Sequence, residues 1–291
     1  MKEELFFLES ETGRPAMTDA LFHVLPAPME KSVSYGTGTS RGPRAVIAAS
    51  QELELFDQGY EPGRAGIHTM ASVDCRGSAE KVLARIEKAV AHTVAMQTIP
   101  VVLGGEHTVT LGAVKAVADR FPSMGIVHLD AHADLRQAYQ GNPLSHASVM
   151  RRVVELGLPL AQFGIRSLCR EEALLQKKNP RITCTTGRAL HDHGIPDPVL
   201  PLDFPRDIYI SVDMDFFDPS LVPATGTPEP GGSLWWDTVG LLEAICRGRK
   251  VRGFDLVELA PIPALHASDF IAAKTVYTLM RLAADQKQLA F

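Results

Sequence analysis

The segment 125–134 reads Gly-Ile-Val-His-Leu-Asp-Ala-His-Ala-Asp, an apolar run that ends in side chains able to bind a metal ion. The apolar part has the length and composition of a buried β-strand. Asp130, His132 and Asp134 stand at alternate positions, and alternate side chains of an extended chain point the same way. A strand that runs out at Asp130 would therefore direct all three side chains into one cavity, whereas a helix would scatter them.

Three other segments repeat this construction, each with a short apolar run followed by acidic or imidazole side chains. The pairs are 99–103 with Glu106 and His107, 207–212 with Asp213 and Asp215, and 251–257 with Glu258. Open α/β sheets bind their ligands beyond the carboxyl ends of their strands. We therefore expect the functional side chains to meet at one edge of a sheet.

The rest of the chain alternates between the spacing of strands and that of helices. Strands are also expected at 21–25 and 161–165, and helices at 44–56, 78–96, 108–121, 146–156, 170–177, 233–246 and 266–284. This β-α-β-α order predicts an α/β fold with three αβα layers around a mostly parallel central sheet. With 291 residues, 45% of them hydrophobic, the chain can bury a large core, and we expect one domain that spans residues 1–291.

Charge and hydropathy argue against several classes of partner. A net charge of -5 offers no electrostatic basis for binding nucleic acid or an anionic membrane. No apolar run reaches membrane-spanning length, and the apolar patch near the N-terminus is too short for a signal peptide, so we expect a cytoplasmic protein. The four cysteines are widely spaced and form no Cys-x-x-Cys pair, so we expect reduced packing residues.

Six side chains after the predicted strands are candidate metal ligands. They are two imidazoles and four carboxylates, namely His107, His132, Asp130, Asp134, Asp213 and Asp215. Any one of them alone would as readily be a solvated or capping residue, but the combined spacing argues against coincidence. Four carboxylates in one pocket would repel each other unless cations held them, and two divalent ions would neutralise their formal charge of about four. Oxygen-rich ligation without thiols favours manganese, with nickel and cobalt as alternatives.

Three of these motifs resemble those of a known family. The stretches 104–107, 130–134 and 211–215 are similar to the signature motifs of the ureohydrolases, the arginase and agmatinase family, and 223–232 continues the third. The similarity extends from the first predicted strand to the last helix. Within the family the chain looks closest to the bacterial and archaeal agmatinases, through Gly-Gly-Glu-His, the Asp-Leu-Arg after the central motif and Thr-Pro-Glu-Pro at 227–230. The resemblance implies an arginase-like fold.

The resemblance also implies which residues hold the ions. By family likeness, one manganese would be bound by His107, Asp130, Asp134 and Asp213, and the other by Asp130, His132, Asp213 and Asp215. Asp130 and Asp213 would bridge the pair. A water or hydroxide held between the ions would be the nucleophile, and Asp134 would also orient it. Relatives form trimers and hexamers, so the resemblance implies a homo-oligomer.

Two further residues match catalytic positions of the family. Glu258 would bind the guanidinium group, and His146 matches a histidine that is assigned proton shuttling or substrate contact in relatives. A guanidinium carbon is a poor electrophile because its positive charge is spread over three nitrogens. The leaving amine must also take a proton, and His146, with an ordinary pKa of about 6.5, is a suitable donor. The alternative is that His146 only opens the following helix beside Ser145.

The substrate is the least constrained part of this interpretation. Family members that hydrolyse arginine carry a polar Ser/Asn/Thr run after the central motif, whereas residues 135–144 here read Leu-Arg-Gln-Ala-Tyr-Gln-Gly-Asn-Pro-Leu. We therefore predict a small cationic guanidino substrate, agmatine, cleaved to putrescine and urea. Aminopropylagmatine, guanidinobutyrate, guanidine and arginine stay open, and Arg136 could pair with the carboxylate of a guanidino acid.

Two other classes of protein compete for the same residues. A deacetylase-like hydrolase would be expected to hold one zinc ion and would not need both Asp134 and His107. A non-catalytic binding protein stabilised by metal would keep the ligands without turnover, and the unbroken ligand set argues against it. The glycine-rich stretch 34–43 either only turns into a helix or lines the substrate pocket.

Several residues near the predicted ligands also have expected roles. His128 either faces the site or packs in the core, and Glu106 is a candidate partner of a ligating histidine. Asp218 is expected to cap a turn. Trp235 and Trp236 are expected in the core rather than in recognition.

Overall fold

The computed structural model describes residues 5–284, which form a parallel sheet between two layers of helices. Within these residues the sheet has eight strands in the order β2-β1-β3-β8-β7-β4-β5-β6, and every paired neighbour is parallel. The strands are β1 (Phe22–Ala27), β2 (Ile67–Thr69), β3 (Ile99–Gly104), β4 (Gly125–Leu129), β5 (Leu160–Ile165), β6 (Ile182–Thr186), β7 (Asp207–Asp213) and β8 (Lys250–Val257). The predicted α/β fold class is confirmed.

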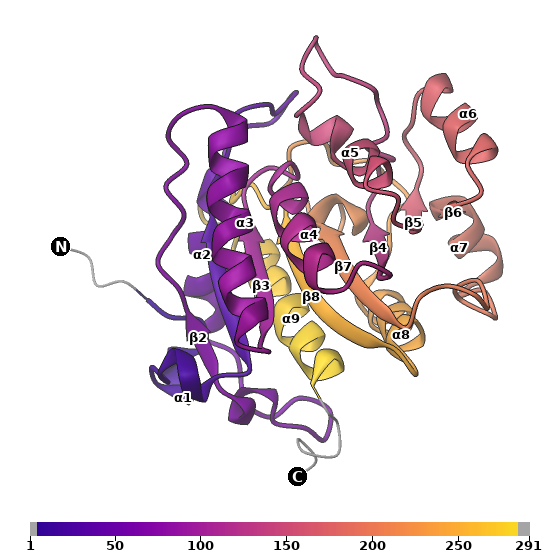
Figure 1. The fold of residues 1–291 in the computed structure, drawn as a ribbon. Coiled ribbons are helices and arrows are strands. Elements are labelled where there is room, and N and C mark those ends of the chain that lie inside the picture. Colours follow the sequence, from indigo (N-terminus) through magenta and orange to yellow (C-terminus); the bar gives the residue numbers. More distant parts are fainter. Residues whose placement is uncertain (1–4, 285–291) are drawn as a thin grey trace.

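The helices cover both faces of this sheet. They are α1 (Glu9–Thr12), α2 (Gly42–Ser50), α3 (Ala79–Ala95), α4 (Val109–Arg120), α5 (Val149–Glu155), α6 (Arg170–Lys178), α7 (Gly187–His193), α8 (Trp235–Cys246) and α9 (His266–Ala283). Figure 1 shows α3, α4 and α5 in front of the sheet and α2, α8 and α9 behind it. Each layer closes one hydrophobic core, so the chain has the three layers that the sequence predicted.

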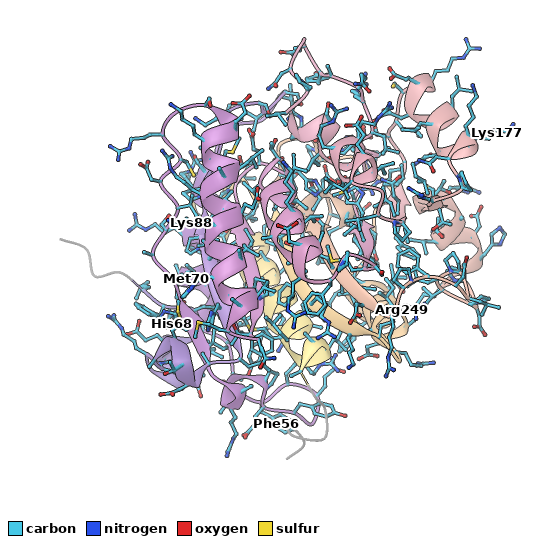
Figure 2. All side chains as sticks on the ribbon, in the orientation of Figure 1. Phe56, His68, Met70, Lys88, Lys177 and Arg249 are labelled. Carbon is cyan, nitrogen blue, oxygen red and sulfur yellow. The ribbon has the colours of Figure 1, made fainter. Side chains whose placement is uncertain are left out.

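Helix α3 shows why these segments are helical and how they attach. Val82, Ile86, Val90 and Val94 recur every four residues, which places them on one face, and all four are buried in the core in front of the sheet. The opposite face is charged and exposed. Figure 2 shows the side chains on the ribbon, including those of Lys88 on α3 and Lys177 on α6, both of which are exposed.

The central strands are buried on both sides. All five residues of β4 are buried, which is typical of a parallel strand covered by helices on both faces. Because alternate side chains point to opposite faces, Val127 and Leu129 pack in one core and Ile126 in the other. The strand therefore has no solvent-facing side, and its polar residues follow at its carboxyl end.

Strand order places the predicted functional segments next to one another. β3, β8, β7 and β4 are consecutive in the sheet, and all run in the same direction. Their carboxyl ends therefore lie along one stretch of one sheet edge. This arrangement brings together residues that are up to about 150 positions apart in the sequence, such as His107 and Glu258.

Some local predictions were incomplete. The structure adds β2, β6 and α7, which the sequence interpretation did not contain. β2 has three residues and β6 is only partly buried, so neither shows the apolar run of a central strand. The helix predicted over 44–56 spans Gly42–Ser50 instead. β1 continues through Pro26 because its pairing with β2 ends at Val24, so the missing N–H costs no bond on that side.

Within the described residues, none of the helices combines the length and the apolar composition needed to span a bilayer.

Candidate metal centre

The polar side chains that follow four adjacent strands meet in one buried cluster. His107 lies between β3 and α4, and Asp130, His132 and Asp134 follow β4. Asp213 ends β7, Asp215 lies in the 3-10 turn after it, and Glu258 follows β8. All are buried except His132, whose side chain is 26% exposed. The predicted convergence of these residues is what the structure shows.

His107 lies at the centre of three carboxylates. Its Nδ1 is 3.2 Å from Asp130 Oδ2, 3.2 Å from Asp134 Oδ2 and 3.1 Å from Asp213 Oδ2. The ring is fully buried, yet this nitrogen makes no hydrogen bond of acceptable geometry to any described residue. Ligand atoms about 2.1 Å from one ion stand about 3 Å apart when they occupy adjacent corners of an octahedron. The spacing around Nδ1 therefore fits atoms that share a cation.

A second ligand group lies beside the first. His132 Nδ1 is 2.9 Å from Asp215 Oδ2 and 3.6 Å from Asp130 Oδ1. Two sets of ligand atoms are close enough to hold a metal ion, one with His107, His128, Asp130 and Asp134 and the other with Asp130, His132 and Asp215. Asp130 belongs to both sets, as expected of a bridging ligand. The cluster is thus able to bind metal, and its donors are oxygen and imidazole nitrogen.

Backbone N–H groups hold one oxygen of several carboxylates and leave the other for the cluster. Asp130 Oδ1 accepts the His132 N–H at 2.6 Å, and Asp213 Oδ1 accepts the Asp215 N–H at 2.9 Å. Asp215 Oδ1 accepts the Ala131 N–H at 3.0 Å. In each case Oδ2 faces an imidazole, and Asp130 Oδ1 also lies 3.6 Å from His132 Nδ1. These bonds orient the carboxylates before any ion is bound.

The cluster is short of positive charge. Burial disfavours the charged form of His107, but the surrounding carboxylates outweigh it and hold the pKa of His107 well above its ordinary value. The same balance, with Asp130 and Asp215 as partners, raises the pKa of His132 to about 12. Burial and the adjacent Asp215 and Asp130 raise the pKa of Asp213 well above its usual range. Without a metal ion, protons on His107, His132 and Asp213 would therefore offset the negative charge that bound cations could neutralise.

Two chains of hydrogen bonds hold the candidate ligands His107 and Asp130 in place. His107 Nε2 is 2.8 Å from Ser211 Oγ, which donates to Asp255 Oδ1 at 2.7 Å. The Tyr209 hydroxyl donates to the other Asp255 oxygen at 2.8 Å. Because Ser211 donates to Asp255, its oxygen accepts from Nε2–H, which leaves the Nδ1 lone pair for an ion. The sequence interpretation assigned no role to Ser211 or Asp255, although each lies two or three residues before a predicted ligand or catalytic residue.

His128 is the second support. Gln162 Nε2 donates to His128 Nδ1 at 2.9 Å and to the Ala133 carbonyl at 2.8 Å, so His128 carries its proton on Nε2. That nitrogen is 2.7 Å from Asp130 Oδ2. Both ring nitrogens are therefore engaged, and His128 faces the site as a partner of Asp130 rather than as a simple core residue.

Two residues of the site have backbone conformations that are unfavourable for side chains. Asp134 has φ 54° and Glu258 has φ 64°, both in the left-handed region. This costs about 1–2 kcal/mol for each residue other than glycine. Glu258 is held there by its own N–H, which donates to the Gly105 carbonyl at 2.8 Å, and its Oε1 accepts the His107 N–H at 2.7 Å.

The cluster forms the floor of a cavity of about 190 Å³. The cavity is lined by the predicted residues His132, Asp134, His146, Asp213, Asp215 and Glu258, together with Val33, Ser34, Tyr35, Gly36, Arg136, Tyr139, Ala147, Gly226 and Thr227. His107 and Asp130 are fully buried and do not reach the lining. The start of the glycine-rich stretch 34–43 therefore lines the pocket and is more than a turn into α2.

The contacts and exposure of three further residues test the roles predicted for them. Asp218 caps a turn as predicted, since its carboxylate accepts the N–H groups of Ser220, Gly231 and Gly232. Trp236 is 68% exposed, so its assignment to the core was wrong. Trp236 lies on the solvent-facing side of α8. The spacing of apolar residues in this helix does not show which of its sides faces the core. Glu106 contacts the segment around Ser32 and no ligating histidine side chain among the described residues.

Fold and cluster together define an α/β protein with a buried His/Asp centre able to hold metal. The Arginase family model matches residues 20–281. The chain belongs to the arginase family, which confirms the resemblance inferred from the motifs.

Individual relatives and solved structures agree with this family assignment. The chain is 40% identical over 258 residues to N(1)-aminopropylagmatine ureohydrolase of Thermus thermophilus, with 87% of each chain covered. It is 33% identical to the agmatinase of Pyrococcus horikoshii, with 91% of this chain and 93% of that one covered. The crystal structure of the agmatine ureohydrolase of Thermoplasma volcanium superposes with a TM-score of 0.85 and 29% identity, covering 97% of this chain and 95% of that one.

Proposed function

We propose that the chain is a metal-dependent ureohydrolase that cleaves agmatine with water to give putrescine and urea. The main observation behind the proposal is the pair of candidate ligand groups that share Asp130 and lie beneath a pocket lined by Glu258 and His146. Membership of the arginase family and similarity to proteins named agmatinase support the same class of reaction.

The ions of this proposal are two manganese ions per subunit. Their ligands would be the six residues singled out in the sequence, His107, Asp130, His132, Asp134, Asp213 and Asp215. Bound divalent ions would neutralise the carboxylates and supply a hydroxide nucleophile near neutral pH. Two groups that share a carboxylate favour this arrangement over the single zinc of a deacetylase-like enzyme. Nickel and cobalt accept similar ligands, so elemental analysis of the purified protein is the test of metal identity.

Glu258 is suited to bind the guanidinium group of the substrate. One of its oxygens accepts the His107 N–H, and the other is left for the N–H groups of a guanidinium in the pocket. Burial raises the pKa of Glu258 to about 8. A guanidinium ion favours the ionised carboxylate, and a buried charge-assisted pair is stronger than an exposed one.

His146 and Asp134 would handle the protons. Attack on the guanidinium carbon gives a tetrahedral species whose amine leaves only after it is protonated. His146 Nδ1 lies 3.4 Å from both Ser32 Oγ and Ser145 Oγ, so Nε2 is the nitrogen that we assign to the leaving amine. Asp134 also lines the pocket, and we assign it the orientation of the attacking water.

A longer substrate is the second candidate. The most similar of the relatives named above is an N(1)-aminopropylagmatine ureohydrolase, and the pocket opens past Tyr35, which is 85% exposed. A substrate with an added aminopropyl group could extend along that opening. Arg136 lines the pocket and would repel an ammonium group placed close to it. The preference between agmatine and aminopropylagmatine would therefore depend on how far the distal ammonium group of each substrate lies from Arg136.

A turnover assay on manganese-loaded protein tests the proposal. Urea release is measured with agmatine, aminopropylagmatine, guanidinobutyrate, guanidine and arginine. The highest kcat/KM is expected for agmatine, and arginine as the best substrate would refute the proposal. A fully metallated protein that releases no urea from any of them would support the non-catalytic alternative.

Cytoplasmic location and a trimeric or hexameric assembly stay predictions. Light scattering of the purified chain tests the assembly.

A further inference from the structure

Glu106 is a fully buried carboxylate whose partners lie outside the metal cluster. It stands next to His107 in the Gly-Gly-Glu-His motif, yet its Oε2 accepts the N–H groups of Lys31 and Ser32 at 2.6 and 2.5 Å. Its Oε1 accepts the Ser32 hydroxyl at 3.0 Å. The carboxylate thus fixes both the backbone and the side chain of Ser32.

Ser32 in turn contacts His146, which is 114 residues away in the sequence. The His146 backbone N–H donates to Ser32 Oγ at 3.0 Å, and His146 Nδ1 lies 3.4 Å from the same oxygen. Because the hydroxyl proton of Ser32 is engaged by Glu106, its oxygen can only accept from His146. An acceptor beside Nδ1 favours the tautomer with the proton on Nδ1 and leaves Nε2 unprotonated in the neutral ring.

The His146 ring also makes an aromatic contact. The rings of Tyr139 and His146 meet edge-on with centroids 5.8 Å apart, and the guanidinium of Arg136 lies 5.5 Å from the Tyr139 centroid. Tyr139 is itself fixed by a tight turn in which its N–H and that of Asn142 bond each other's carbonyl groups at 3.0 and 2.8 Å. The half-buried imidazole therefore contacts both the Ser32 oxygen and the Tyr139 ring.

We propose that Ser32 is a positioning residue for His146, with its hydroxyl oriented by Glu106. This inference rests on the proposed function, because it concerns how the proton donor is held. Ser32 fixes the start of the 3-10 turn that carries His146 through the backbone bond, and fixes the ring through Nδ1. Nε2 is then directed to the leaving amine, where it delivers the proton that the imidazole took up beforehand.

If Ser32 only held the loop at 31–36 in place, its substitution would disturb the backbone of that loop. Glu106 holds this loop mainly through two backbone N–H groups, and Ser32→Ala leaves both of these bonds intact. The substitution removes the Ser32 oxygen that faces His146 and its donation to Glu106 Oε1, and it leaves Ser145 Oγ in place 3.4 Å from His146 Nδ1. Ser148 supplies a matched control, since it is a buried serine in the same 3-10 turn and its hydroxyl has no partner among the described residues.

Steady-state kinetics on the manganese-loaded full chain is the first test. Ser32→Ala is expected to lower kcat for agmatine roughly 5- to 30-fold, the effect of one lost hydrogen bond, with KM and metal content nearly unchanged. Ser32→Thr is expected to restore most of kcat, and Ser148→Ala to leave it unchanged. In a His146→Asn background, Ser32→Ala is expected to have less than a twofold further effect, because the residue on which Ser32 acts is gone.

A crystal structure of Ser32→Ala is the second test and does not depend on activity. The His146 ring is expected to rotate or to show more than one position, while residues 31–36 keep their backbone. Full kcat in Ser32→Ala, or an unchanged His146 ring in its crystal structure, would overturn the inference. So would an equal loss in the presence and absence of His146. If the wild-type protein hydrolyses no guanidino compound, the proposed function fails, and the position of the ring still decides whether Ser32 holds it.

Discussion

Removal of the Ser211 hydroxyl is expected to weaken metal binding although it changes none of the candidate metal ligands. Ser211 Oγ lies between His107 Nε2 at 2.8 Å and Asp255 Oδ1 at 2.7 Å, and all three residues are fully buried. Ser211→Ala leaves Nε2 without an acceptor and Asp255 with one fewer donor. Burial already raises the pKa of Asp255 above its usual value, so loss of the donor favours its neutral form. The tautomer that leaves the His107 Nδ1 lone pair free is then no longer favoured.

The size of the effect follows from this geometry. Loss of a group that orients a metal-bound histidine costs about 10- to 100-fold in metal affinity, or about 1.4–2.7 kcal/mol. Thr110 Oγ1 lies 3.4 Å from Ser211 Oγ, which is longer than a usual hydrogen bond between two hydroxyl groups, so Thr110 would have to move to take the place of Ser211. The lower half of the range is therefore expected if Thr110 moves toward His107, and the upper half if it does not.

Manganese affinity is measured by chelator competition, and unfolding by thermal melts with and without the metal. Ser268→Ala is the matched control, because Ser268 is fully buried in α9 and its hydroxyl has no partner among the described residues. The control is expected to bind manganese like the wild type. An affinity of Ser211→Ala within twofold of the wild type would refute the reasoning that Ser211 fixes the His107 tautomer.

Three further predictions concern the backbone, the substrate and the protons. Gly105→Ala is expected to destabilise the fold by about 3 kcal/mol in urea unfolding, since a Cβ there would lie 2.1 Å from the Met29 carbonyl oxygen; a loss below 1 kcal/mol would contradict this. Glu258→Gln is expected to lower kcat/KM for agmatine about 10- to 100-fold at unchanged metal content, and an unchanged value would remove Glu258 from the site. Because the pKa values of metal-free His107 and His132 are raised, both hold protons at neutral pH that a metal must displace. Manganese affinity should therefore fall as pH falls, and calorimetry in buffers of different ionisation enthalpy should show proton release; affinity that does not change with pH would contradict it.

The ligand cluster could be predicted from the sequence because its signal is local. In 125–134 the apolar run and the alternation of Asp130, His132 and Asp134 indicate both the strand and the direction of its side chains. The parallel sheet follows from the alternation of strands and helices, and the edge that holds the site follows from the parallel direction. The structure confirms the parallel sheet and brings the candidate ligands together at that edge. The roles of the individual ligands and the extent of the single domain stay predictions.

The supporting residues could not be predicted because their signal is in the fold alone. Ser32 and Glu106 meet over 74 residues, and Gln162 reaches His128 from a neighbouring strand, so no spacing in the sequence indicates either contact. The same holds for Trp236, whose exposure depends on which side of α8 faces the core. Edge elements such as β6 were missed because partial exposure removes the apolar run that marks a strand.

The division of the pocket between strand ends and loops has an evolutionary consequence. The candidate ligands and Glu258 follow four buried, adjacent strands, whereas Tyr35, Arg136 and Tyr139 lie on connecting segments outside the eight-stranded sheet. Mutations at Tyr35 and Arg136 can change which substrates the pocket accepts while the candidate ligands and Glu258 stay the same. New specificities can therefore arise on this scaffold through a few substitutions in the segments that line the pocket.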